Sequence, residues 1–146
     1  MKKTLLILAL TFASVAVFAQ TKKKPVSKTK PVAGLAATIT AGQKVYTTYC
    51  VSCHQADGGG VQNMNPPLIK TPYVLGDKVR MAKIVINGFS ENVEINGDTY
   101  TNTMPALAML KDEEIAAVLT YVRNSFGNKA PAVTVADVKK ARAAKK

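Results

Sequence analysis

The chain has 146 residues, of which 20 are Lys or Arg and nine are Asp or Glu, giving a formal net charge of +11. Such a charge suggests nucleic acid or anionic membrane as a partner. However, only seven of the basic residues lie within positions 38–128, together with eight of the nine acidic ones. The positive charge therefore belongs to the two ends of the chain, where basic runs are usually solvated tethers, and nucleic acid is not an expected partner.

The first 19 residues predict a cleaved export signal. Lys2 and Lys3 precede an apolar run over residues 5–18, which is shorter than the roughly 20 residues that a bilayer span needs. Cleavage is expected after Ala19, and an uncleaved membrane anchor is the alternative. We therefore expect a periplasmic protein without a transmembrane span after cleavage, a location that also argues against nucleic acid.

Three segments are expected after the signal. Residues 20–37, rich in Lys, Pro, Thr and Ala, predict a linker, and residues 38–128 predict one small folded domain. Residues 129–146 form a basic C-terminal tail, for which a short helix from Val135 and a frayed end fit equally well. The two basic tails are expected to offer an electrostatic contact to anionic membrane or to an acidic partner face.

The elements of the domain begin with two predicted helices. The first covers residues 38–50, where Thr40 and Gln43 form a capping-box pattern, and it runs directly into Cys50. The second covers residues 77–88, with Asp77 as its cap and Asn87-Gly88 as its end.

A hairpin and a last helix follow. Asn96-Gly97, within residues 93–100, is the strongest short signal for a β-hairpin. The last helix is expected within residues 111–127, with an acidic first turn, Arg123 near its end and Gly127 just past it. The predicted architecture is mostly α.

Residues 50–54, CVSCH, contain both cysteines and the only histidine of the chain. This spacing predicts a c-type haem, because Cys50 and Cys53 would add to the two haem vinyl groups and His54 would bind the iron. A domain of about 90 residues without Trp buries a marginal core, which a haem would complete.

Three other interpretations of CVSCH remain open. A structural disulfide is favoured by an oxidising compartment but needs no adjacent His. A thioredoxin-like redox pair needs a βαβ context, whereas the flanking sequence is helical. A structural zinc site needs four ligands, and Asp57 would be a weak fourth.

A second axial ligand would have to be Met, because His54 is the only histidine. Met104 is preferred, since it lies in a loop after the hairpin and could reach the opposite haem face. The other candidates are Met64, Met81 and Met109, of which Met109 is the main rival. The alternative is that Met104 only packs and leaves the iron five-coordinate.

The order of AGQKVYTTYCVSCHQADGGG, NPPL, NGDTYTNTMPAL and DEEIAAVLTYVRNSFGN resembles the class I, mono-haem bacterial cytochrome c family over residues 38–128. The resemblance implies a mostly α, cytochrome c-like helical domain packed around one covalently bound haem c, with a short β-hairpin before the axial Met. It also implies that the first and last helices cross at positions matching Gly42, Tyr46 and Tyr121.

The same resemblance implies two residues beside the haem. The Pro66 carbonyl would accept a hydrogen bond from the His54 ring, and Leu68 would pack on the haem face. The chain departs from the family in its hairpin before Met104, and in Lys111, which leaves only the Glu114 half of a capping box. For the haem propionates, the sequence offers Arg80, Lys83, Tyr73 and Tyr100, each of which also fits a solvated or core role.

The expected function is that of an exported one-electron carrier and not of an enzyme, because two axial ligands leave no open coordination site. Expected partners are a quinol-oxidising complex on one side and a terminal oxidase, a reductase or a periplasmic dehydrogenase on the other. A haem enzyme or gas sensor with an open iron site is one alternative. A haem-free disulfide module for protein interaction is another.

Overall fold

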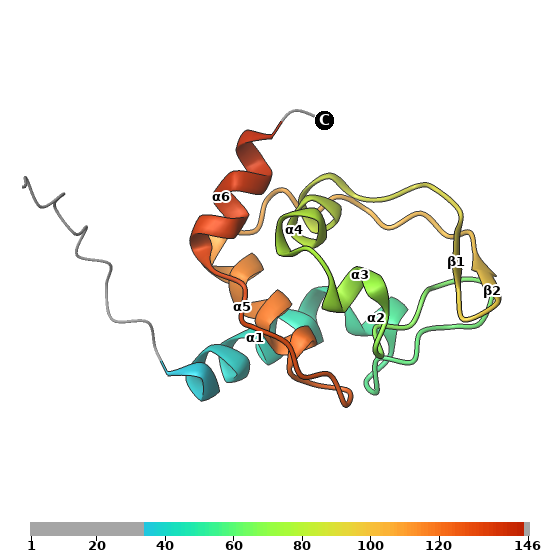
Figure 1. Cartoon of the computed structure of the whole chain (residues 1–146), viewed down its shortest axis with the longest axis horizontal. Coiled ribbons are helices and arrows are strands. Elements are labelled where there is room, and N and C mark those ends of the chain that lie inside the picture. The colour runs from blue at the N-terminus through green and yellow to red at the C-terminus, as the bar shows by residue number, and fades with distance from the viewer. Residues whose placement is uncertain (1–33, 145–146) are drawn as a thin grey trace, which may run out of the picture. The chain divides into compact units, whose positions relative to one another are not determined.

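A computed structural model describes residues 34–144 of the chain (Figure 1). The predicted signal, residues 20–33 of the predicted linker and residues 145–146 lie outside the described part. Its elements are α1 (Leu35–Tyr49), α2 (Val51–His54), α3 (Pro72–Leu75), α4 (Lys78–Asn87), β1 (Val93–Ile95), β2 (Asp98–Tyr100), α5 (Asp112–Arg123) and α6 (Val135–Ala143). The predicted mostly α fold with a short hairpin is confirmed. Within residues 34–144, no helix is long and apolar enough to cross a membrane.

Helix α1 begins earlier than the sequence predicted. Its N-cap is Gly34, and its first turn lies in the segment expected to be linker. Thr40 is therefore not a cap: its hydroxyl donates to the Ala36 carbonyl at 3.1 Å, as hydroxyls inside helices do. The residues before Thr40 include Leu35, Ala36 and Ala37, which are strong helix formers and extend the helix backwards.

Helix α4 and the hairpin follow their local signals. The Asp77 carboxylate accepts a hydrogen bond from the Arg80 N–H at 2.6 Å, which is the predicted N-cap. Asn96 and Gly97 have φ values of 56° and 89°, the positive values that a tight hairpin turn requires. Strands β1 and β2 pair antiparallel on either side of this turn.

Helix α5 ends at Arg123, so the prediction that Gly127 directly follows the helix is wrong. The side-chain amide of Asn124 donates to a carbonyl of the last turn at 2.9 Å and so terminates the helix earlier. At the other end, the Glu114 carboxylate accepts from the Lys111 N–H at 2.8 Å. This is the half of the capping box that the sequence predicted.

Helices α1 and α5 cross at Gly42, as the family resemblance implied (Figure 1). A Cβ atom on Gly42 would lie 2.6 Å from the carbonyl carbon of Ala117 and 2.8 Å from Cβ of Tyr121. Next to this crossing, the Tyr46 ring packs against Tyr121 and Phe126, with centroids 5.3 and 5.4 Å away. The close approach of the two helices requires Gly at this position.

Helix α6 packs on α4 and α5 and buries Val138 and Ala141. Thr134 and Asp137 form a capping box at its start, and Lys78 of α4 pairs with Asp137 at 3.0 Å. Burial acts to raise the pKa of Asp137, but the hydrogen bonds from Thr134 and Lys78 outweigh it and hold the pKa below its usual value. The folded unit therefore continues past the boundary predicted at Asn128, and the described part of the tail is not frayed.

Candidate haem site

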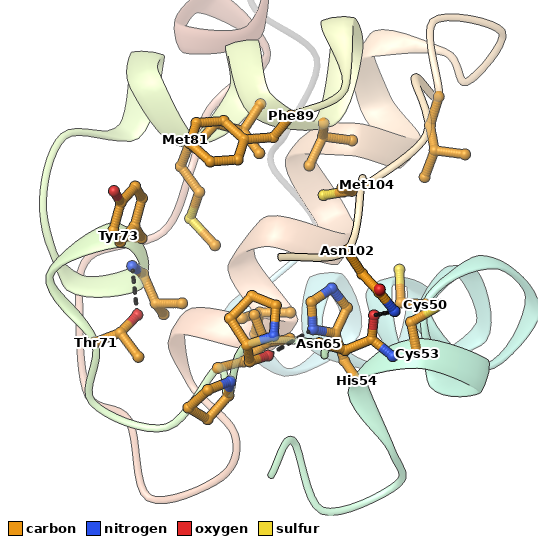
Figure 2. Close-up of a pocket in the computed structure, with 18 of the residues that line it drawn as sticks. Cys50, Cys53, His54, Asn65, Thr71, Tyr73, Met81, Phe89, Asn102 and Met104 are labelled. Carbon is orange, nitrogen blue, oxygen red and sulfur yellow. Dashed lines mark hydrogen bonds between the residues drawn. The ribbon is translucent and has the colours of Figure 1, made fainter. Parts of the chain in front are cut away.

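A largely apolar cavity lies between α2, α4, α5 and the hairpin segment, and the six residues predicted to attach the haem, bind its iron or flank it all line this cavity (Figure 2). These residues are Cys50, Cys53, His54, Pro66, Leu68 and Met104. Aliphatic side chains of α4 and α5 form much of the wall, and the rings of Tyr46, Tyr73, Phe89 and Tyr100 complete it. The fold thus brings together residues from segments that are far apart in the sequence.

The cysteines lie where α1 passes into α2. The Cys50 N–H donates to the Tyr46 carbonyl and the His54 N–H to the Cys50 carbonyl, both at 2.9 Å, so one helical turn carries the whole motif. Both cysteines are free thiols, Cys53 being exposed and Cys50 half-buried. Burial, with the neighbouring Cys53 as a smaller cause, raises the pKa of Cys50 to about 11. The Cys50 thiol is therefore protonated at neutral pH.

The His54 ring is oriented by Pro66. Nδ1 of His54 lies 3.0 Å from the Pro66 carbonyl oxygen. A proton on Nδ1 donates to that oxygen and leaves Nε2 with a lone pair for a metal. Burial lowers the pKa of His54, and the Pro66 contact opposes this shift only in part. The ring is therefore neutral at neutral pH, which is the form that binds metals.

The segment that carries Pro66 and Leu68 is anchored by Asn128, a residue that the sequence analysis missed. The Asn128 amide donates to the Leu68 carbonyl at 2.9 Å, and its oxygen accepts from the Lys70 N–H at 2.8 Å. The side chain is only 3% exposed. No local pattern marks it, because its partners lie about 60 residues earlier.

Met104 is held at the opposite wall of the cavity from His54 (Figure 2). Its backbone pairs with Phe89 through two hydrogen bonds of 2.8 and 3.0 Å. Met81 of α4 lines the same cavity from the core. The other two rivals point elsewhere and are exposed: Met64 (49%) and Met109 (65%).

Two asparagines join the segments before Pro66 and Met104. The Asn102 side chain donates to the Asn65 side chain at 3.2 Å, and the Asn102 N–H donates to the Met64 carbonyl at 3.1 Å. Figure 2 shows this contact at the cavity beside Cys53. Neither asparagine carries a local sequence signal, since their contact depends on the hairpin folding back.

The propionate candidates divide into two pairs. Tyr73 and Tyr100 line the cavity, whereas Arg80 and Lys83 are not part of its lining. The Arg80 guanidinium lies over the Tyr73 ring, 4.3 Å from its centroid, so it packs against the outer side of the cavity wall. Propionate binding by any of the four stays a prediction.

The residues present fit a haem. Two free thiols lie at one edge of the cavity, a neutral imidazole presents its unbonded nitrogen to the interior, and a thioether faces it. Nitrogen and sulfur ligands of this kind suit iron in a haem. Apolar walls suit the porphyrin.

The chain belongs to the cytochrome c family, since residues 39–126 match the family model for cytochrome c. It is 34% identical over 121 residues to a cytochrome c-552 of Thermus thermophilus, covering 77% of this chain and 81% of that protein.

Cytochrome subunits of dehydrogenases are also similar. The cytochrome c subunit of alcohol dehydrogenase (quinone) from Gluconacetobacter polyoxogenes is 38% identical over 103 residues, which is 69% of this chain but 22% of that subunit. The gluconate 2-dehydrogenase cytochrome c subunit of Pantoea cypripedii is 34% identical over 101 residues, 66% of this chain and 23% of that subunit. The chain is therefore a class I c-type cytochrome, an electron-transfer domain with covalently bound haem c.

Proposed function

We propose that the protein is an exported one-electron carrier in which His54 and Met104 both bind the haem iron. The main support for this proposal is that the unbonded ring nitrogen of His54 and the side chain of Met104 enter one apolar cavity from opposite walls. The bound haem supplies the ferrous–ferric couple. With His54 and Met104 both bound, the iron would have no coordination position open to a substrate.

The chain's own residues attach and tune the cofactor. The thiols of Cys50 and Cys53 would hold the haem covalently. The Pro66 carbonyl holds the proton on Nδ1 of His54, which fixes the tautomer and strengthens Nε2 as a donor. Leu68 and the aliphatic walls exclude water, which disfavours the more highly charged ferric state.

The proposed location is the periplasm, and the proposed electron donor is a periplasmic dehydrogenase. Residues 1–19 carry the features of an export signal. The similarity to cytochrome subunits of dehydrogenases supports this class of donor. A quinol-oxidising complex is the other donor class, and a terminal oxidase or reductase would be the acceptor. The basic tails would add an electrostatic contact to the membrane or to a partner.

The ligation is tested by the visible spectrum of the haem-loaded protein, oxidised and reduced, before and after addition of CO. We expect a c-type reduced spectrum that CO does not change. Met104→Leu should open the iron and make the reduced spectrum sensitive to CO. The control Met109→Leu should not, because Met109 is exposed and outside the cavity lining.

The other outcomes separate the alternatives. A wild-type spectrum that CO shifts would move the assignment to a haem enzyme or gas sensor. Protein without covalent haem, from cells that mature other c-type cytochromes, would favour the disulfide module. Export is tested by cell fractionation, in which haem-loaded protein retained in the membrane after a high-salt wash would contradict cleavage.

A further inference from the structure

Arg142 of α6 binds the turn that connects Met104 to α5. Its Nε donates to a carboxylate oxygen of Asp112 at 2.6 Å, and its Nη1 donates to the Ala108 carbonyl at 3.2 Å. Its Nη2 donates to the Leu110 carbonyl. One guanidinium therefore holds three acceptors within five consecutive residues, through hydrogen bonds that are assisted by its charge.

This turn also forms part of the cavity wall. Leu107 and Leu110 both line the cavity and are buried. Between them lie Ala108, which is exposed, and Met109, which is 65% exposed. A backbone hydrogen bond of 2.9 Å from Leu107 to Val85 ties the turn to α4. Arg142 adds a second attachment beyond Leu107, on the side towards α5.

Arg142 is itself on a helix that is docked independently. Val138 and Ala141 are buried, and Asp137 pairs with Lys78 of α4 at the opposite end of α6. The position of α6 is therefore set by contacts other than those that the Arg142 guanidinium makes with the turn. This allows the effect of Arg142 on the turn to be separated from its effect on the docking of α6.

We propose that Arg142 is a positioning residue for Met104. Met104 is paired with Phe89 through its own N–H and carbonyl, and on its C-terminal side the chain is attached first by the Leu107–Val85 hydrogen bond and then by Arg142. Loosening the Arg142 attachment gives the chain between Met104 and α5 more conformations, including ones in which the thioether leaves its place. Arg142 thus favours the state with Met104 bound. This inference rests on the proposed His54–Met104 ligation.

The test uses the full-length haem-loaded protein and two readouts of the iron–sulfur bond. One is the red-edge charge-transfer absorption of a thioether bound to ferric haem, and the other is the pH at which this absorption is lost on alkaline titration. For Arg142→Gln we expect the midpoint to fall by about one pH unit, the tenfold change that corresponds to loss of one charge-assisted hydrogen bond. Arg142→Lys should give an intermediate midpoint, because Lys keeps the charge but not the planar set of donors.

Two control variants separate positioning from charge and from docking. Lys139→Gln removes a positive charge from an exposed position of the same helix and should leave the midpoint unchanged. Lys78→Gln breaks the ion pair that docks the other end of α6 and should lower the thermal midpoint without moving the alkaline one.

Several results would overturn the inference. An unchanged alkaline midpoint in Arg142→Gln would do so, as would equal shifts in Arg142→Gln and Lys78→Gln that follow their thermal stabilities. If Arg142→Gln yields no haem-loaded protein, the test falls to Arg142→Lys. An Arg142→Lys protein with the alkaline midpoint of the wild type would also overturn the inference. Absence of the charge-transfer absorption in the wild type would instead refute the proposed Met ligation.

Discussion

Tyr46 shows how a single side chain links the packing of helices to the haem site. Its hydroxyl donates to the Gln55 carbonyl at 2.6 Å, while its ring packs against Tyr121 and Phe126. Gln55 directly follows His54 and has a φ of 64°, in the left-handed region that non-glycine residues rarely adopt. The phenol therefore stabilises the backbone at the point where the chain leaves His54, the proposed iron ligand.

We expect Tyr46→Phe to lower the free energy of unfolding by about 1 kcal/mol at neutral pH, since it removes one hydrogen bond and keeps the ring. Burial, and to a smaller extent Cys50 and other nearby groups, raise the pKa of Tyr46 above its usual value of 10. A raised pKa in the folded state means that the stability is complete below pH 10 and is lost as the pH rises above it.

This pH dependence is measured by denaturant unfolding of the haem-loaded protein from neutral pH to above pH 10. The difference between wild type and Tyr46→Phe should shrink as the pH rises, because the variant lacks the group that titrates. Tyr49→Phe is the control, since Tyr49 is exposed. Parallel curves for wild type and Tyr46→Phe would contradict the expectation.

At the scale of elements, the crossing of α1 and α5 depends on Gly42. A Cβ at this position would collide with backbone atoms of Ala117, which cannot turn away as the end of a flexible side chain can. We expect Gly42→Ala to lower the free energy of unfolding by about 1–3 kcal/mol, as overpacking does. Gly34→Ala is the matched control, because no atom lies within 4 Å of the added Cβ. Chemical denaturation giving equal losses for both variants would refute this explanation.

Elements whose ends are set by residues close in the sequence were predictable. Asp77 caps α4 and Asn96-Gly97 turns the hairpin because each acts on its own neighbours. Thr40 was wrongly predicted as the N-cap of α1. A Thr hydroxyl can cap a helix, but inside a helix it can also donate to the carbonyl one turn earlier, as Thr40 does. Helix α3 has a Thr cap followed by Pro72, but four residues are too few to show a period.

A haem motif was predictable from the sequence because Cys50, Cys53 and His54 lie within five consecutive positions, and the binding role of each residue stays a prediction. The residues that support the site were not, because their partners are distant. Arg123 looked like a charge at the exposed end of a helix, yet it is 2% exposed and donates to carbonyls, including those of Gly76 and Pro131. Burial accordingly lowers the pKa of Arg123. Only the fold shows that this cation joins α5 to two loops.

At the scale of the whole molecule, the C-terminal segment is part of the core. Val133 and Val138 are buried, and the Thr120 hydroxyl of α5 exchanges hydrogen bonds of 3.0 and 3.2 Å with the backbone of Val133. The composition of this segment, rich in Lys and Ala, fitted a frayed end as well as a short helix from Val135. The capping box of Thr134 and Asp137 was the signal that could have decided between them.

Truncation after Asn128 should therefore destabilise the protein strongly. The loss of two fully buried valines alone corresponds to about 3–6 kcal/mol, a large part of the stability of a typical domain. The measurement is chemical denaturation of the truncated and full-length haem-loaded proteins. A full-length variant carrying Lys139→Gln and Lys140→Gln removes charge from α6 without removing buried surface, and should unfold like wild type. If it lost as much stability as the truncated chain, charge and not burial would be the cause.

The crossing of α1 and α5 also has a consequence for the order in which the protein is made. It joins the first and last helices of the family domain, so it closes a long loop and can form only when both helices exist. In a chain synthesised from its N-terminus, α1 and the two cysteines emerge well before α5. Until then the domain has not closed around Cys50, which is half-buried in the finished fold. The sequence order of the two helices thus leaves an interval for cofactor attachment before the domain closes.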